Sequence, residues 1–311
     1  MRRALVAGAG GYLGLAIVHA LAGSGWEVRG LVRTSTAIRR VEAEGGRCVV
    51  ADILDATAVE TTARGCDLMI HVAASSASSA DDPRYGARVR EEGCRNLLRA
   101  ARIHGIRRIV VGSGYWVYAD QPGTITEESP LDPRGESRVN FATEMAAQDP
   151  GIRGSTEVVV VRPGMVYGDG SWCRSALDAI SDGTYRYIEA GANSWSFISR
   201  EDAGTAFAHV AETGAPGEVY NLVDGRPAAW REFGDFIAHR LGRLPPGRLA
   251  VEEAERLYGP DVAHHLRARR ACSSAKLERL GWKPKFREFR EGLPATVPEL
   301  SDDEPRTDRT S

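Results

Sequence analysis

The chain has 311 residues, 42% of them hydrophobic, and a formal net charge of −2, so it can bury one large domain or one domain plus a smaller lobe. The near-neutral charge argues against a nucleic-acid partner, and no apolar run is long enough to cross a bilayer. Its five scattered cysteines favour free thiols over disulfides or a metal site, so we expect a cytoplasmic protein without a metal.

A glycine-rich turn near the start of the chain is the strongest local signal. An apolar run at residues 4–7 predicts a buried strand, residues 15–22 predict a helix, and residues 28–33 predict a second strand. Glycines between the first strand and the helix would let backbone N–H groups approach a pyrophosphate at the helix N-terminus. We therefore assign this turn to dinucleotide binding, through Gly8, Gly11, Tyr12, Leu13 and Gly14.

The end of the second strand bears on the choice between NAD(H) and NADP(H). An acid at this place would bind the adenosine ribose, but Val32 and Arg33 stand there instead. A guanidinium binds a phosphate with its forked geometry, and Ser35 offers a further donor. We therefore expect NADP(H) as the cofactor. The alternative is that Arg33 is an ordinary solvated charge.

Further strands are predicted at residues 48–53, 67–74, 106–112 and 158–161, the last leading into the motif Arg162-Pro163-Gly164-Met165-Val166-Tyr167-Gly168. With the G-x-x-G-x-x-G spacing, these motifs resemble the extended branch of the short-chain dehydrogenase/reductase superfamily, which contains sugar-nucleotide epimerases and dehydratases. The resemblance implies an α/β fold with a doubly wound, Rossmann-type parallel sheet and a smaller, mostly helical C-terminal lobe. We expect the NADP-binding domain at 1–166 and about 197–224, the substrate lobe at 167–196 and 225–298, and a disordered tail at 299–311.

The same resemblance implies further cofactor contacts. They comprise a pair at the adenine, small residues beside the pyrophosphate and ribose, and backbone at the nicotinamide amide: Asp52 and Ile53; Val72, Ala73 and Ala74; Pro163 and Val166. His71 lies inside an apolar strand, so we interpret it as a hydrogen-bonded core residue rather than a base.

The catalytic residues that the resemblance implies are missing. Relatives carry a Ser or Thr after the fifth strand and a Tyr-x-x-x-Lys on the next helix, where the phenol transfers the proton. Here Gly114 stands at the hydroxyl place with Ser113 before it, while Glu136 and Asn140 stand at the tyrosine and lysine places. The remaining weak candidates are Ser113, Tyr115 and Asn140, with Asn140 as a hydrogen-bonding group for the cofactor or the substrate.

An aromatic-rich stretch follows residue 168 and could stack a flat substrate, although Trp172 and Trp195 could equally be core. The expected substrate contacts are Ser75, Tyr115, Trp116, Trp172, Tyr187 and Trp195. The chain resembles atypical ketoreductases that tailor aromatic polyketides, such as the one acting on the angucyclinone of simocyclinone. We therefore expect NADPH-dependent, substrate-assisted reduction of a carbonyl on a bulky aromatic small molecule. The alternatives are a non-catalytic NADP-binding sensor and a non-redox lyase or cyclase, and the oligomeric state stays open.

Overall fold

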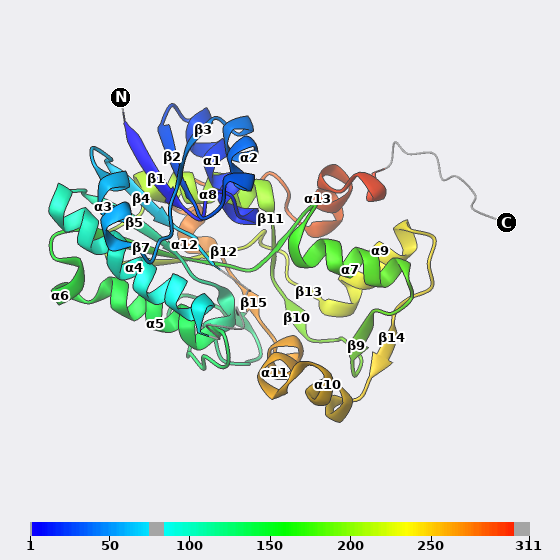
Figure 1. Ribbon diagram of the computed structural model, residues 1–311. Helices are drawn as coiled ribbons and strands as arrows, with labels where there is room; N and C mark the ends of the chain where they lie inside the picture. Colours follow the sequence, from blue (N-terminus) through cyan, green and yellow to red (C-terminus); the bar gives the residue numbers. More distant parts are fainter. Residues whose placement is uncertain (1, 75–83, 302–311) are drawn as a thin grey trace.

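A parallel β-sheet organises the computed structural model, which describes residues 2–74 and 84–301. Across these residues seven strands pair in the order β12-β7-β5-β4-β1-β2-β3 (Figure 1). The strands are β1 (Arg3–Ala7), β2 (Glu27–Val32), β3 (Gly46–Val50), β4 (Leu68–His71), β5 (Arg108–Gly112), β7 (Glu157–Pro163) and β12 (Val219–Leu222). The expected α/β fold with a Rossmann-type sheet is confirmed.

Helices cover both faces of the sheet because the strands are apolar on both sides. Ala4 and Val6 of β1 pack into one core, whereas Leu5 and Ala7 pack into the core on the other face. The first face carries α1 (Tyr12–Gly23), α2 (Ile38–Ala43), α8 (Arg200–Thr213) and the short α12 (Ala275–Glu278). The second carries α3 (Ala56–Ala63), α4 (Tyr85–His104), α5 (Ser137–Gln148) and α6 (Pro150–Arg153) (Figure 1).

A smaller lobe lies beside the carboxyl ends of the strands (Figure 1). Its helices are α7 (Ser171–Ser181), α9 (Trp230–Arg240), α10 (Val251–Tyr258), α11 (Pro260–Arg267) and α13 (Phe289–Thr296). Short strand pairs complete it and join it to the sheet: β9 (Arg186–Ile188) with β14 (Gly247–Leu249), β10 (Ser194–Trp195) with β13 (Ala228–Ala229), β8 (Met165–Tyr167) with β11 (Phe197–Ser199), and β6 (Thr124–Ile125) with β15 (Ala271–Cys272). Its core contains many aromatic rings, among them the stacked Trp195 and Trp230 at 5.0 Å.

Two predicted boundaries need correction. The third strand ends at Val50, so Asp52 and Ile53 lie in the following turn rather than in the strand. The predicted disordered tail begins too early, because Leu300 is 1% exposed in the core of the lobe and Glu299 pairs with Arg174 at 2.6 Å. Residues 302–311 of that predicted tail lie outside the described part of the chain, and the division into domains stays a prediction.

A buried ion pair joins the end of β7 to α5. Arg162 binds Glu144 of α5 through two hydrogen bonds of 3.0 and 2.6 Å, and both side chains are buried. Arg162 also donates to the hydroxyl of Tyr118 at 2.9 Å, and that hydroxyl donates to Asn221 at 2.7 Å. Burial raises the pKa of the Tyr118 phenol. Because both sides of this hydroxyl are occupied, Tyr118 serves packing rather than proton transfer.

Asp224, just after β12, is a buried carboxyl with incomplete hydrogen bonding. Its Oδ1 accepts from the Arg226 N–H at 3.0 Å, whereas Oδ2 is buried and has no partner among the described residues. Burial raises the pKa of Asp224 to about 8, and the nearby Glu288 and Asp202 carboxylates add to the rise. The folded protein therefore holds a proton on Asp224 at neutral pH, whereas the unfolded chain does not.

We predict that Asp224→Asn removes a pH-dependent loss of stability. Between the unfolded pKa near 4 and the folded value of about 8, the folded state binds the extra proton, so wild-type stability falls as pH rises. The variant should match the wild type near pH 4 and exceed it increasingly up to pH 8, with a limiting slope of about 1.4 kcal/mol per pH unit. Urea unfolding from pH 4 to 9 measures this difference. The exposed Asp178→Asn is the matched control, and a constant difference for Asp224→Asn would contradict the assignment.

Candidate active site

An open cavity of about 730 Å³ runs along the carboxyl ends of the strands. It lies where the strand order reverses, between β1 and β4, which is the usual ligand position in such sheets. Its wall comprises the glycine turn, the ends of β2 to β5 and the segment around β8: Gly8, Gly10–Gly14, Leu31–Thr34, Ala37, Arg40, Ala51–Ile53, Val72–Ala74, Tyr85, Val89, Arg90, Gly112, Ser113, Glu136, Gly164–Val166, Ser171 and Trp172.

The glycine turn brings three backbone segments together. Gly8 has φ +89°, and a Cβ there would lie 2.6 Å from the Cα of Ala73 after β4. A Cβ on Gly14 would lie 2.0 Å from the Gly8 carbonyl oxygen. Helix α1 begins at Tyr12, and the N–H groups of Tyr12 and Leu13 have no backbone acceptor among the described residues. These N–H groups at a helix N-terminus suit an anion such as pyrophosphate.

Basic side chains line the end of the cavity beyond β2. Arg33 is exposed and lies 5.2 Å from the centre of the Tyr85 ring, while Arg40 of α2 donates to the Gly10 carbonyl at 3.0 Å. Asp52 accepts from the Tyr85 hydroxyl at 2.9 Å and from the Leu54 N–H at 2.9 Å. The predicted Ser35 is exposed but does not line the cavity. Arg40, which the sequence analysis missed, lies there instead.

The opposite end of the cavity lies between β4, β5 and β8. Val72, Ala73 and Ala74 line it as expected, and so does Val166, whose carbonyl accepts from the Trp172 indole at 2.7 Å. Pro163 is buried at the end of β7 and does not reach the cavity, so the lining backbone there begins at Gly164. Of the predicted aromatic substrate contacts, Trp172 is the one that lines the cavity.

The structure separates the three weak catalytic candidates. Ser113 lines the cavity, and its hydroxyl is buried without a partner among the described residues. Asn140 lies behind the wall and accepts from Arg90 at 2.5 Å. Tyr115 is 1% exposed in a separate apolar cluster, where burial raises the pKa of its phenol. Tyr115 is therefore corrected to a core residue, because its ring is enclosed by protein.

Other predicted substrate contacts also differ from expectation. Trp195 is 2% exposed and stacks on Trp230, and the buried Tyr187 hydroxyl donates to Asp235 at 2.9 Å. Trp116 packs 4.8 Å from the His265 ring and does not line the cavity. Their ring faces contact other protein side chains, so we correct Trp116, Tyr187 and Trp195 to packing residues. Ser75 lies outside the described residues.

Arg90 of α4 is a second functional candidate that sequence reasoning missed. It lines the cavity with Ser113 and Glu136, and it is half-buried. Its backbone carbonyl accepts from His71 Nε2 at 3.0 Å. Burial lowers the pKa of His71 to about 4, so the neutral ring donates here, as its interpretation as a core histidine implied. Arg90 stands in a helix rich in arginines, and nothing in the sequence distinguishes it from its exposed neighbours.

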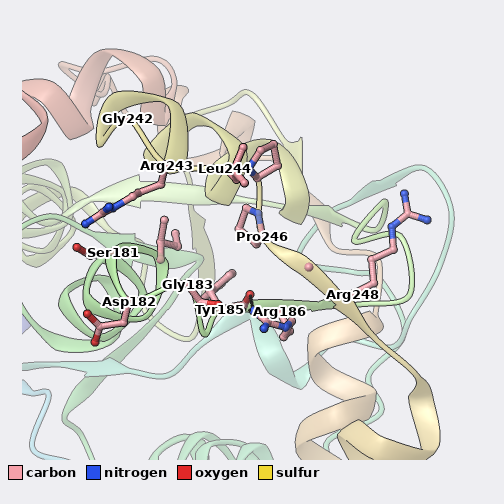
Figure 2. Close-up of a pocket in the computed structure, with 13 residues that line it drawn as sticks. Ser181, Asp182, Gly183, Tyr185, Arg186, Gly242, Arg243, Leu244, Pro246 and Arg248 are labelled. Atoms are coloured by element: carbon pink, nitrogen blue, oxygen red, sulfur yellow. Dashed lines mark hydrogen bonds between the residues drawn. The ribbon is translucent and has the colours of Figure 1, made fainter. Parts of the chain in front are cut away.

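A second hollow of about 700 Å³ lies in the lobe, between the end of α7 and the loop at residues 242–248. Figure 2 shows that Arg243 and Arg248 extend away from each other rather than toward a common point. Leu244 on its rim is 88% exposed. Because its polar groups do not converge, we place the active site in the first cavity.

Comparison with known proteins identifies the family. The model of the NAD dependent epimerase/dehydratase family matches residues 4–222, so the chain belongs to this family. The fold agrees, since a dTDP-glucose 4,6-dehydratase from Streptomyces venezuelae with NAD bound superposes with a TM-score of 0.80 at 26% identity, covering 97% of each chain.

Two relatives are named as reductases. The chain is 34% identical over 309 residues to a 3-diazoavenalumate denitrifying reductase of a Streptomyces species, covering 94% of this chain and 99% of the relative. It is 31% identical over 250 residues to a 4-hydroxy-2-methyl-3-oxo-4-farnesyl-3,4-dihydroquinoline-1-oxide ketoreductase of Stigmatella aurantiaca, covering 77% and 73%. These findings support an oxidoreductase enzyme with a nicotinamide dinucleotide cofactor. Within the described residues, no helix is both long and apolar enough to span a membrane.

The residues present fit such a cofactor. The glycine turn packs backbone against backbone at Gly8 and Gly14, and the first turn of α1 presents N–H groups without a backbone acceptor among the described residues. Small residues after β4 line the end of the cavity between β4, β5 and β8, which Ser113 also lines with a buried hydroxyl that has no partner among the described residues. These features together supply an anion site, an extended groove and an unsatisfied donor.

We predict that Gly14→Ala disrupts both folding and cofactor binding. The new Cβ would meet the Gly8 carbonyl oxygen at 2.0 Å, so α1 must move, at a cost of about 1–3 kcal/mol. Gly23→Ala at the other end of α1 is the matched control, because its Cβ would have nothing within 4 Å. Urea unfolding and a fluorescence titration with NADPH measure the two effects. If Gly14→Ala behaves like Gly23→Ala, the close packing of α1 on the turn is wrong.

Proposed function

We propose that this protein catalyses NADPH-dependent reduction of a carbonyl group on a bulky aromatic substrate. The cavity carries the proposal. It is lined by the Arg90 guanidinium and by the Ser113 hydroxyl, which has no partner among the described residues, and both groups are suited to a developing oxyanion. The full-length match to a reductase and the match to a ketoreductase support the same chemistry. A sensor without chemistry would not need these groups at the nicotinamide end.

The preference for NADPH is supported by the charge around β2. Arg33, Thr34 and Arg40 line the cavity there, and β2 ends at Val32 without an acid. The carboxylate at this end, Asp52, already accepts two hydrogen bonds from the protein. Two guanidinium groups attract a 2′-phosphate and offer forked donors, whereas a free ribose hydroxyl would gain less from them.

The substrate's own phenol is the proposed proton donor. When bound, the cofactor supplies a hydride, and the resulting alkoxide must be protonated or stabilised as it forms. Both hydrogen-bonding sides of the Tyr118 hydroxyl are occupied, and Tyr115 is enclosed by protein, so neither phenol is placed to donate a proton in the cavity. A phenol beside the carbonyl would already hold the proton close to the alkoxide oxygen.

Reduction of an aryl diazonium is the second candidate. It is favoured by the match of nearly the whole chain to a 3-diazoavenalumate denitrifying reductase. Hydride addition to the ring carbon with loss of N₂ needs no proton donor, which would also suit a site without the usual acid. The charge of Arg90 disfavours it, because a cation held about 5 Å from a guanidinium is repelled by about 3 kcal/mol at an effective dielectric constant of 20. We therefore rank carbonyl reduction first.

We predict that NADPH binds roughly ten- to a hundredfold more tightly than NADH. A charge-assisted contact to the 2′-phosphate contributes about 1.5–3 kcal/mol to binding. Arg33→Ala or Arg40→Ala should therefore reduce the difference between the NADPH and NADH binding free energies by the contribution of the lost contact. Fluorescence titration of both cofactors against the wild type and each variant gives one pair of dissociation constants for every protein. The exposed Arg39→Ala, which does not line the cavity, is the control. Equal affinities in the wild type would overturn the assignment.

We predict that methylating the phenol beside the carbonyl slows reduction by about a hundredfold or more, because the proton donor is lost. Steady-state rates compare the phenol with its methyl ether in wild type, Ser113→Ala, Tyr115→Phe and Glu136→Gln. If the ether reacts normally while one variant loses more than about a thousandfold in kcat, a margin of roughly 4 kcal/mol, the acid belongs to the protein. If neither ketone reacts but an aryl diazonium releases N₂, the second candidate is correct.

A further inference from the structure

Arg90 is held at two points in the cavity wall. His71 of β4 fixes its backbone carbonyl at 3.0 Å, and Asn140 of α5 accepts from its guanidinium at 2.5 Å. Both anchors come from elements other than its own helix. The His71 contact holds the backbone at Arg90, and the Asn140 contact limits the rotamers of its long side chain, so the guanidinium is placed before any ligand arrives.

The guanidinium keeps most of its donors available. It has five N–H groups and no acceptor, so the carbonyl oxygen of Asn140 must face it. Among the described residues, Asn140 is the one side-chain hydrogen-bond partner of the guanidinium. Its other donors have no acceptor within residues 2–74 and 84–301, and the cavity that Arg90 lines is also lined by Ser113.

The surroundings make this charge effective. The guanidinium is half-buried, so water screens it only partly. This burial lowers the pKa of Arg90, and the nearby Glu136 carboxylate opposes that shift. A half-buried guanidinium remains charged at neutral pH. Its attraction for an oxyanion is stronger here than on a fully exposed surface, because the effective dielectric constant is lower.

We infer that Arg90 and Ser113 together form the oxyanion site for the substrate, and that Asn140 is a positioning residue that acts through Arg90. This inference rests on the proposed carbonyl reduction. The carbonyl carbon gains the hydride with its electron pair, and the C=O π electrons move onto oxygen. Arg90 and Ser113 donate hydrogen bonds to that oxygen, and the neighbouring phenol then gives up its proton and regains one from water.

Four variants separate charge, geometry and fold. Arg90→Gln removes the charge, and Arg90→Lys keeps it on a different shape. Asn140→Asp keeps the acceptor but partly neutralises the guanidinium. Arg95→Gln is the matched control, because it lies exposed on the same helix and outside the cavity.

With the phenolic ketone, Arg90→Gln should lower kcat by about a hundredfold or more, while KM and the Kd for NADPH change only a few-fold. Arg90→Lys should recover part of that loss. Asn140→Asp should keep or raise the melting temperature yet lower kcat at least about tenfold, since a structural role alone would not separate the two. Arg95→Gln should match the wild type. If Arg90→Gln does not fold, Asn140→Asp and Arg90→Lys decide.

A spectroscopic titration tests the oxyanion site without turnover. 4-Nitrophenol absorbs differently as phenol and phenolate, so its absorbance in the NADP⁺-saturated protein reports the pKa of the bound probe. The wild type and Arg95→Gln should lower this pKa below the value in water, and Arg90→Gln should abolish the shift. A wild type that shows no preference for the phenolate overturns the inference.

The kinetic outcomes distinguish this inference from the proposed function. If Arg90→Gln raises KM but leaves kcat intact, Arg90 binds a substrate carboxylate and the inference is wrong. If it weakens NADPH more than tenfold without changing kcat, Arg90 belongs to the cofactor site and the inference is again wrong. If the wild type reduces no carbonyl, the proposed function fails, and the nitrophenol titration still decides whether Arg90 forms an oxyanion site.

Discussion

The close approach of α1 to the ends of β1 and β4 is the constraint on which the rest of the site depends. Gly8 and Gly14 meet backbone atoms at distances that no side chain could occupy, so the helix start is held at the carboxyl edge of the sheet. This contact aims the first N–H groups of α1 at the cavity. The glycine turn and the ends of β2 and β5 line the same cavity.

Arginines define both ends of the cavity, with different degrees of exposure. Arg33 and Arg40 are exposed beyond β2, where Arg33 lies over the Tyr85 ring and Arg40 donates to the Gly10 carbonyl. Arg90 at the other end is half-buried, with its backbone carbonyl held by His71 and its guanidinium held by Asn140. The first arrangement suits recognition of a charge that is present before binding. The second suits a negative charge that develops only during the reaction, because a preorganised group need not rearrange as that charge forms.

The parts of the site that depend on backbone were predictable from the sequence, because glycine spacing and apolar strands report local geometry directly. Gly8, Gly14 and Ala73 lie where they were expected. The side-chain contacts were not predictable in the same way. Trp195 and Tyr187 look like a stacking platform in the sequence, but only the packing of α9 shows that protein rings already cover them.

Arg90 shows the opposite difficulty. It stands among several arginines of α4, and its role follows from the distant Asn140 and His71, which no spacing rule connects to it. Leu300 was missed for a similar reason, because a single apolar residue beside an acidic tail does not indicate that the core of the lobe encloses it. Such contacts depend on tertiary neighbours rather than on local pattern.

The lobe has a consequence for how this protein could diversify. In the described part of the chain its core is assembled from three separated stretches, near residues 167–197, 228–263 and 289–300. Between them the chain returns to the sheet through α8, whose Gly204 lies so close to α1 that a Cβ would approach the Ala16 carbonyl oxygen to 2.4 Å. Because these stretches are separated in the sequence, the lobe cannot be exchanged between relatives as one continuous segment. Recombination between relatives would have to cut at several points at once, so new specificities should accumulate by point substitution in a lobe that stays in place.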